Sequence, residues 1–194
     1  DGLGKHMPSL VIFVSSTRIF AENDGGWVNE LSPRTKTDPL GKSIVEAEEL
    51  LRGASLPLVS LYCSGLYGFP TDYLLKRVKE GAFSSKSDKS FTNRIHRQDV
   101  AGVFAWLIGS KLNRERLQSA YIVSDSYPAS RMEIELWLSE KLGLCENGRK
   151  KVDVLPTRGG NKRCDNGLLL TSGYKLLYPD FKSGYESILE PLDR

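Results

Sequence analysis

The segment from Leu10 to Gly53 constrains the fold more than any other part of the chain. It opens with five consecutive apolar residues, 10–14, which stop abruptly at Ser15, Ser16 and Thr17. A short apolar run rich in β-branched and aromatic residues and bounded by polar ones predicts a β-strand covered on both faces. Open α/β sheets bind ligands at the carboxyl ends of their strands, so the three hydroxyls form a candidate site.

A helix is predicted to follow this strand. Asp38 suits its N-cap, Pro39 suits its first turn, and Gly53 can end it in the left-handed conformation. The apolar residues at helical spacing, expected to face the sheet, are Leu40, Ile44, Ala47 and Leu51. The next apolar run, 56–61, predicts a second strand parallel to the first, joined to it by a right-handed helical crossover. The expected fold class is therefore α/β.

Later elements continue the same alternation. Thr71 or Asp72 can cap a short helix, and residues 120–124 predict a third strand. Ser130 and Glu133 stand at the spacing of a capping box, which predicts the start of another helix.

Composition excludes several classes of protein. The 194 residues carry a net charge of only +3 and no dense run of lysine and arginine, which argues against a nucleic-acid partner. No apolar segment is long enough to span a membrane, so no membrane partner is expected. Three widely spaced cysteines, Cys63, Cys145 and Cys164, predict free thiols in a reducing cytosol. With only His6 and His96 to join them at unsuitable spacings, no metal site is expected.

Three consecutive segments resemble a known family. They read VIFVSSTRIFAENDG, DPLGKSIVEAEELL and LPLVSLYCSGLYG, and NRIHRQDVAGVF and SDSYPASRMEIELWLSEKLGL follow in the same order. Together they resemble the C-terminal portion of an extended short-chain dehydrogenase/reductase of the NAD-dependent epimerase/dehydratase group, in particular its atypical, sugar-epimerase-like bacterial members. The resemblance implies NAD or NADP as cofactor and a nucleotide sugar or related small molecule as substrate.

The resemblance also implies an architecture. Residues 1–68 would form the remaining part of a Rossmann-like parallel sheet, the second half of a doubly wound fold. Residues 69–194 would return to that sheet over about 93–125 and form a small C-terminal substrate lobe.

The glycine-rich turn that grips the dinucleotide pyrophosphate in this family is absent. No G-x-G-x-x-G follows a strand in the sequence. We therefore expect cofactor binding from the complete fold rather than from these residues alone. A parallel sheet without its first half bares an edge, so the chain on its own is expected to self-associate or to need that half.

The catalytic pair of the family also differs here. Its Tyr and Lys, four residues apart on one helix face, fall on Leu40 and Ile44, while Ser16 aligns with the family's Ser or Thr. We expect Leu40 and Ile44 to face the space in front of Ser16. The nearby phenols are Tyr62 and Tyr67, and Tyr67 is the candidate substitute acid beside Ser16, although an ordinary phenol pKa near 10 makes it slow.

Binding roles follow from the same resemblance. The exit of the second strand resembles the segment that passes beside the nicotinamide, so the predicted cofactor-binding residues are Ser15, Ser16, Cys63, Ser64 and Gly65. Thr17, Arg158 and Arg163 are the predicted substrate-binding residues, since forked guanidinium donors suit a diphosphate. A solvated basic loop is the competing interpretation for both arginines. A structural hydrogen-bonding role is expected for His96.

Two functions remain open at this point. The first is an NAD(P)-dependent epimerase or reductase-like enzyme, an isomerase or oxidoreductase, whose Tyr–Lys pair is replaced. The second is a non-catalytic dinucleotide-binding sensor or scaffold of the same fold. The sequence does not distinguish NAD from NADP, because the strand that sets this choice is not among these residues.

Overall fold

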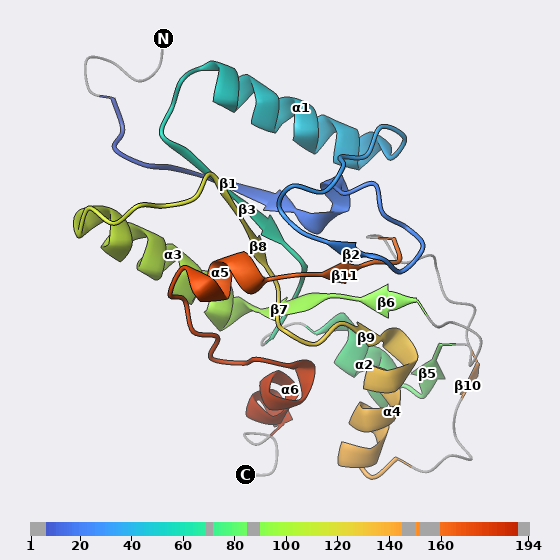
Figure 1. Ribbon diagram of the computed structural model, residues 1–194. Coiled ribbons are helices and arrows are strands. Elements are labelled where there is room, and N and C mark those ends of the chain that lie inside the picture. The colour runs from blue at the N-terminus through green and yellow to red at the C-terminus, as the bar shows by residue number, and fades with distance from the viewer. Residues whose placement is uncertain (1–6, 69–71, 85–89, 145–149, 152–159, 190–194) are drawn as a thin grey trace.

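The computed structural model describes residues 7–68, 72–84, 90–144, 150–151 and 160–189. Its centre is a three-stranded parallel sheet of β1 (Val11–Ser16), β3 (Leu58–Cys63) and β8 (Ala120–Val123), in the order β1-β3-β8. Helix α1 (Pro39–Gly53) lies on one side of this sheet and α3 (Arg97–Leu112) on the other (Figure 1). The predicted α/β class and the parallel crossover are confirmed.

Alternation along β3 explains how both of its faces are filled. Val59, Leu61 and Cys63 point to the α3 side, where they pack with Val103 and Leu107 in one apolar cluster. The residues between them face α1, where Tyr62 joins a second cluster that Ile44 and Val45 of α1 cover. Because successive side chains of a strand point to opposite faces, one continuous apolar run serves two layers of helix.

Strand β1 is less covered than its apolar sequence predicts. Among the described residues it pairs only with β3, and the side chain of Val14 is 55% exposed. The prediction of a strand buried on both faces is therefore wrong for β1, whose outer edge is open in the described part of the chain.

The start of α1 is confirmed and two details are corrected. Asp38 caps the helix by accepting the Gly41 N–H at 2.8 Å. Leu40 does not face the sheet as predicted but is 61% exposed, because the inward face of the helix runs through Gly41, Ile44 and Glu48. The left-handed residue after the helix is Ser55, with φ of 55°, and not Gly53.

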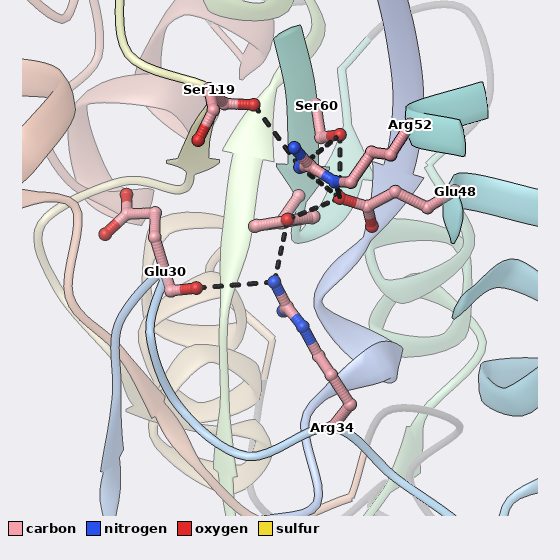
Figure 2. A network of polar contacts seen from close by, with 7 residues as sticks. Glu30, Arg34, Glu48, Arg52, Ser60 and Ser119 are labelled. Carbon is pink, nitrogen blue, oxygen red and sulfur yellow. Dashed lines mark hydrogen bonds and ion pairs between the residues drawn. The ribbon is translucent and has the colours of Figure 1, made fainter. Parts of the chain in front are cut away.

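A buried carboxylate joins α1 to the sheet. Glu48 Oε1 accepts hydrogen bonds from Ser60 Oγ at 2.8 Å, Tyr62 Oη at 2.7 Å and Arg52 Nη2 at 2.6 Å. Figure 2 shows Glu48 and Arg52 pointing from α1 toward Ser60, with Arg34 approaching from the opposite side. Arg34 Nη2 donates to the Tyr62 hydroxyl at 2.7 Å, so this network also ties the loop before α1 to β3.

A second body of helices packs beyond the carboxyl ends of the strands. It is built from α2 (Tyr73–Lys79), α4 (Arg131–Lys141) and α6 (Phe181–Leu189), whose apolar faces share one cluster around Phe181 and Leu138. We call it the lobe, and Figure 1 shows it below the sheet. Asp72 caps α2 and Ser130 caps α4, as predicted.

Short strands and turns complete the described chain. The parallel pairs are β4 (Gly65–Tyr67) with β7 (Arg94–His96), β2 (Trp27–Val28) with β11 (Arg163–Cys164), and β5 (Ala82–Phe83) with β10 (Lys150–Lys151). The pair β6 (Phe91–Thr92) with β9 (Ala129–Ser130) is antiparallel, and η1 (Thr17–Ile19) and α5 (Gly167–Thr171) are single turns or little more. The division of the chain at residue 68 stays a prediction.

Candidate functional site

A cavity of about 400 Å³ lies where the sheet meets the lobe. Its sheet side is formed by the ends of β1 and β3, with Ser16, Thr17 and Ser64 among its lining residues. Its lobe side includes Arg77 of α2 and Arg131 of α4. We call this space the strand-tip cavity. Its position agrees with the sequence prediction that ligands bind at the carboxyl ends of these strands.

Ser16 is the best placed hydroxyl in the strand-tip cavity. Its Oγ accepts the Arg18 N–H at 3.2 Å as the N-cap of η1. An oxygen that accepts here keeps its own O–H free to donate to a ligand. Arg18 is fixed in turn by Asp38, whose carboxylate accepts from Arg18 Nε at 2.5 Å and Nη2 at 2.7 Å. Asp38, the N-cap residue of α1, therefore also fixes the position of Arg18 in η1, the turn that Ser16 caps.

The other hydroxyls that line the cavity have protein partners. Ser64 Oγ donates to the Val123 carbonyl oxygen at 3.3 Å, and the Thr17 hydroxyl is hydrogen-bonded to the thiol of Cys164. Gly65 also lines the cavity, and a Cβ at this position would lie 3.1 Å from the Asn93 carbonyl oxygen. Of the predicted cofactor-binding residues, the structure thus brings Ser16, Ser64 and Gly65 together.

Ser15 and Cys63 do not line the strand-tip cavity. The Ser15 hydroxyl is buried and has no hydrogen-bond partner among the described residues. Cys63 packs in the apolar cluster under α3, and burial raises the pKa of its thiol to about 12. Neither side chain is placed to meet a cofactor in this cavity, because Ser15 is buried outside it and Cys63 is packed in the apolar cluster.

Tyr67 lines the cavity but is poorly suited to proton transfer. Its ring packs edge-on against His96 at a centroid distance of 5.2 Å and against Tyr185 at 4.9 Å. Burial, followed by the nearby carboxylate of Asp125, raises the pKa of the phenol far above its ordinary value of 10. The predicted substitute acid is thus harder to ionise than the sequence alone suggests.

Tyr62 lies outside the strand-tip cavity. Its hydroxyl donates to Glu48 and accepts from Arg34, and burial raises its pKa. It therefore serves the network between α1 and β3.

Leu40 and Ile44 do not face the space in front of Ser16, which corrects our prediction. Neither lines the strand-tip cavity. Ile44 packs against the cluster that contains Ile19 and Tyr62, while Leu40 is exposed to solvent. The correspondence of these two positions with a Tyr–Lys pair therefore rests on the sequence resemblance alone.

Of the two predicted diphosphate-binding arginines, Arg163 does not line the cavity. Arg158 lies outside the described residues. The Arg163 guanidinium stacks between the rings of Trp27 at 5.1 Å and Phe91 at 4.9 Å. Its Nε donates to the Gly25 carbonyl oxygen at 2.8 Å, so this side chain fastens a loop.

Sequence reasoning did not assign to the site any of the five charged residues that the structure describes on this cavity wall: Arg18, Asp72, Arg77, Arg94 and Arg131. Arg94 is the first residue of β7, where it is buried together with Ile95 and His96. No sequence signal marked Arg77 as a site residue, because an arginine on a helix is usually exposed to solvent.

His96 has the structural hydrogen-bonding role that the sequence predicts, and Asp99 has a similar one. His96 Nδ1 accepts the Gln98 N–H at 3.3 Å and caps α3, and burial lowers the pKa of its imidazole. Asp99 is fully buried and accepts the backbone N–H groups of Leu177 and Tyr178. These contacts tie α3 to the segment before α6.

No group of three or more potential metal ligands among His, Cys, Asp and Glu gathers in the described part of the chain. Cys63 and Cys164 are free thiols, while Cys145 lies outside the described residues. No described helix combines the length and the apolar character needed to cross a bilayer.

Comparison with known proteins agrees with this architecture. No family model and no curated protein matches the chain. Among solved structures, a "putative NAD-dependent epimerase/dehydratase" from Methylobacillus flagellatus is 31% identical with a TM-score of 0.78, covering 96% of this chain and 65% of that one. A functionally unknown conserved protein from Silicibacter pomeroyi DSS is 28% identical with a TM-score of 0.79, covering 94% of this chain and 66% of that one.

The structural neighbours of the chain are NAD-dependent epimerase/dehydratase proteins. The human epimerase family protein SDR39U1 with NADPH shares the fold, with a TM-score of 0.78 at 16% identity over 94% of this chain and 66% of its own. The chain thus spans slightly less than two thirds of the length of these proteins. Their match confirms the predicted Rossmann-like α/β architecture.

Proposed function

We propose that the full-length protein is an NAD(P)-dependent epimerase- or reductase-like protein acting on a nucleotide sugar or a related carbonyl or alcohol. The observation that carries this proposal is the Ser16 hydroxyl, which keeps a free proton at a strand tip and faces a cavity shared with the lobe. Structural neighbours solved with NAD or NADP support the cofactor class.

The cavity residues suit one end of such a cofactor. Ser16, Ser64 and the open backbone at Gly65 would hold the nicotinamide end beside the strand tips. When bound, the dinucleotide would supply hydride exchange. No G-x-G-x-x-G occurs in the sequence. The residues of this chain therefore do not include a glycine-rich turn that would bind the pyrophosphate at a helix N-terminus.

The protein's own contribution would be orientation of the reacting oxygen. Ser16 can donate a hydrogen bond to a substrate carbonyl or alkoxide oxygen at the strand tip, since its Oγ accepts from the Arg18 N–H and its own O–H stays available. Tyr67 remains the candidate acid, although its raised pKa leaves it neutral and a reluctant proton donor.

A non-catalytic dinucleotide-binding sensor or scaffold is the second candidate. It is favoured by the enclosure of Tyr67, whose hydroxyl reaches the Asp180 carbonyl oxygen at 3.5 Å rather than open space. It is also favoured by Leu40 and Ile44, hydrocarbon residues where the resemblance places the proton-transferring pair.

Titration of NADH and NADPH into the full-length protein, followed by fluorescence, tests the cofactor. Turnover on a panel of nucleotide sugars then separates the two candidates, because binding without turnover selects the sensor. For an enzyme, Ser16→Ala should lower turnover by about 10- to 100-fold through loss of one donor, while Ser43→Ala on the exposed side of α1 should not. Turnover that survives Ser16→Ala and fails in Tyr67→Phe would reassign the chemistry to the phenol. Absence of dinucleotide binding would refute both candidates.

A further inference from the structure

Positive charge gathers on the wall of the strand-tip cavity. Its described charged lining residues are Arg18, Arg77, Arg94, Arg131 and Asp72. Arg18 is neutralised by its paired hydrogen bonds to Asp38. The remaining three arginines, on α2, β7 and α4, are accompanied by a single carboxylate among the described lining residues, so the cavity wall carries an excess of cations.

Arg77 is buried without full pairing. Its side chain is 9% exposed, and its Nε and Nη2 have no hydrogen-bond partner in the part of the chain that the structure describes. Nη1 makes a long contact of 3.4 Å with the Tyr73 hydroxyl. A guanidinium keeps its charge at every physiological pH. Arg77 therefore cannot avoid the desolvation cost of a buried charge by losing a proton.

Arg94 of β7 is in a similar position. It is also 9% exposed, and its Nη1 has no hydrogen-bond partner among the described residues. Asp125 lies near it, but within the same described part of the chain the Asp125 Oδ2 has no partner either, so the two groups do not satisfy each other. Among the ion pairs of the described residues, none includes Arg77 or Arg94.

Unpaired buried N–H donors on a permanent cation are costly, and two such residues lining one cavity need a common acceptor. A cationic or apolar ligand would leave the donors unsatisfied. The planar fork of each guanidinium matches the oxygens of a phosphoryl or carboxylate group.

We infer that Arg77 and Arg94 bind an oxyanion, a phosphoryl or carboxylate group of a small ligand, at the lobe end of the strand-tip cavity. The ligand extends from this anion site to the Ser16 hydroxyl at the strand tips, which lines the same cavity. As a description of the substrate the inference rests on the proposed function, and it places the anion on Arg77 and Arg94 instead of on Arg158 and Arg163.

The test measures anion binding by the full-length protein directly. Inorganic phosphate and acetate, each titrated at constant ionic strength with chloride as the balancing ion, distinguish the two kinds of oxyanion. We expect saturable binding of at least one of them, measured by calorimetry and by a rise in melting temperature. Arg77→Gln and Arg94→Gln should each weaken this binding tenfold or more, while Arg116→Gln, at an exposed arginine outside the cavity, should leave it unchanged.

A second variant separates binding from folding. Arg77→Met keeps an unbranched apolar stem and removes the unpaired donors, so it should raise the melting temperature of the free protein and abolish the effect of the anion. A structural arginine would show the reverse, a lower melting temperature with anion binding intact, and that result overturns the inference. Arg77→Lys and Arg94→Lys, which retain the charge, should fold and bind the anion more weakly than the parent protein.

The inference and the proposed function fail independently. NADH binding without saturable phosphate or acetate binding overturns the anion site and leaves the function standing. Anion binding that depends on Arg77 and Arg94, in a protein that binds neither NADH nor NADPH, supports the site and refutes the function. Anion binding that is unchanged in both glutamine variants overturns the site.

Discussion

Glu48 and Asp125 are both buried carboxylates, yet their surroundings shift their pKa values in opposite directions. Burial alone would raise the pKa of Glu48, but hydrogen bonds from Arg52, Tyr62 and Ser60 outweigh it and hold the pKa below its ordinary value. Asp125 receives only the Tyr127 N–H, at 3.2 Å, and burial raises its pKa to about 7. The number of donors, rather than the depth of burial, decides which form is stable.

Glu48→Gln should destabilise the protein because the amide is a weaker acceptor for three donors and leaves Arg52 unpaired. We expect a loss of about 1–3 kcal/mol at pH 7, measured by urea unfolding. The depressed pKa means that the contribution of Glu48 is present above pH about 4.3 and is lost as the pH falls through the folded-state value. Glu49→Gln, one residue further along on the exposed face, is the control and should change the free energy of unfolding little.

Asp125→Asn should show the opposite dependence on pH. A raised folded-state pKa means that the native protein binds more protons than the unfolded chain between pH about 4 and 7, so the parent protein loses stability as the pH rises through this range. The asparagine variant should lack this slope and exceed the parent by about 2–4 kcal/mol at pH 8. Urea unfolding at pH 5 and pH 8 measures both quantities, with Asp24→Asn as an exposed control. Parallel pH profiles for parent and variant would contradict the assignment.

At the scale of elements, the junction between β4 and α6 is packed without spare room. A Cβ on Gly184 of α6 would lie 1.8 Å from the Tyr67 hydroxyl and 2.6 Å from its Cζ. Tyr67 cannot retreat, because the rings of His96 and Tyr185 contact it. This glycine therefore allows the lobe to approach the sheet closely enough to form the strand-tip cavity.

Gly184→Ala should lower the free energy of unfolding by about 2–3 kcal/mol through overpacking. Gly109→Ala in α3 is the matched control: nothing lies within 4 Å of a Cβ there, so helix propensity should stabilise the protein by about 0.5–1 kcal/mol. Adding Tyr67→Phe to Gly184→Ala should recover part of the loss. Equal stability of Gly184→Ala and the parent would show that the two elements do not meet as described.

At the scale of the whole molecule, the open edge of β1 governs how the chain behaves on its own. Parallel sheets are normally covered on both faces and rarely leave a long edge free. Here the described part of the chain pairs one edge of β1 and leaves Val14 more than half exposed. The edge therefore offers backbone donors and acceptors beside an apolar side chain.

The 194-residue chain expressed alone should consequently self-associate, as measured by static light scattering over a concentration series. Val14→Lys should reduce the association, because a charge beside an open edge disfavours strand pairing. Leu31→Lys, at a loop residue that is 93% exposed, should have no comparable effect. A concentration-independent monomer would refute this prediction.

Local patterns in the sequence accounted for the order of the elements. The apolar runs of β1, β3 and β8 and the caps Asp38, Asp72 and Ser130 act within a few residues, and the structure has each of them. Element ends were less predictable: β3 is Leu58–Cys63 rather than 56–61, because pairing with β1 and β8 decides where a strand stops.

The candidate site was only partly predictable. Ser16 and Thr17 could be singled out because the end of a strand is visible in the sequence as a change from apolar to polar residues, whereas Ser64 and Gly65 came from the family resemblance; all four line the cavity. Arg77 and Arg94 were not singled out, since they lie on two different elements, α2 and β7, and line one cavity only when the tertiary structure brings these elements together. Arg163 was assigned to the substrate by its charge, but its pairing with two aromatic rings depends on contacts with segments about 70 and 135 residues earlier in the chain.

The sequence by itself determined a parallel α/β chain with hydroxyls at its strand tips, because hydrophobic period, caps and strand ends are local properties. Only the tertiary structure decided which side chains face one another. It turned Leu40 outward, buried Glu48 against β3, enclosed Tyr67 and left two arginines short of partners. Burial and pairing depend on groups brought together from distant parts of the chain, and these set the pKa values and the unsatisfied donors on which a binding site depends.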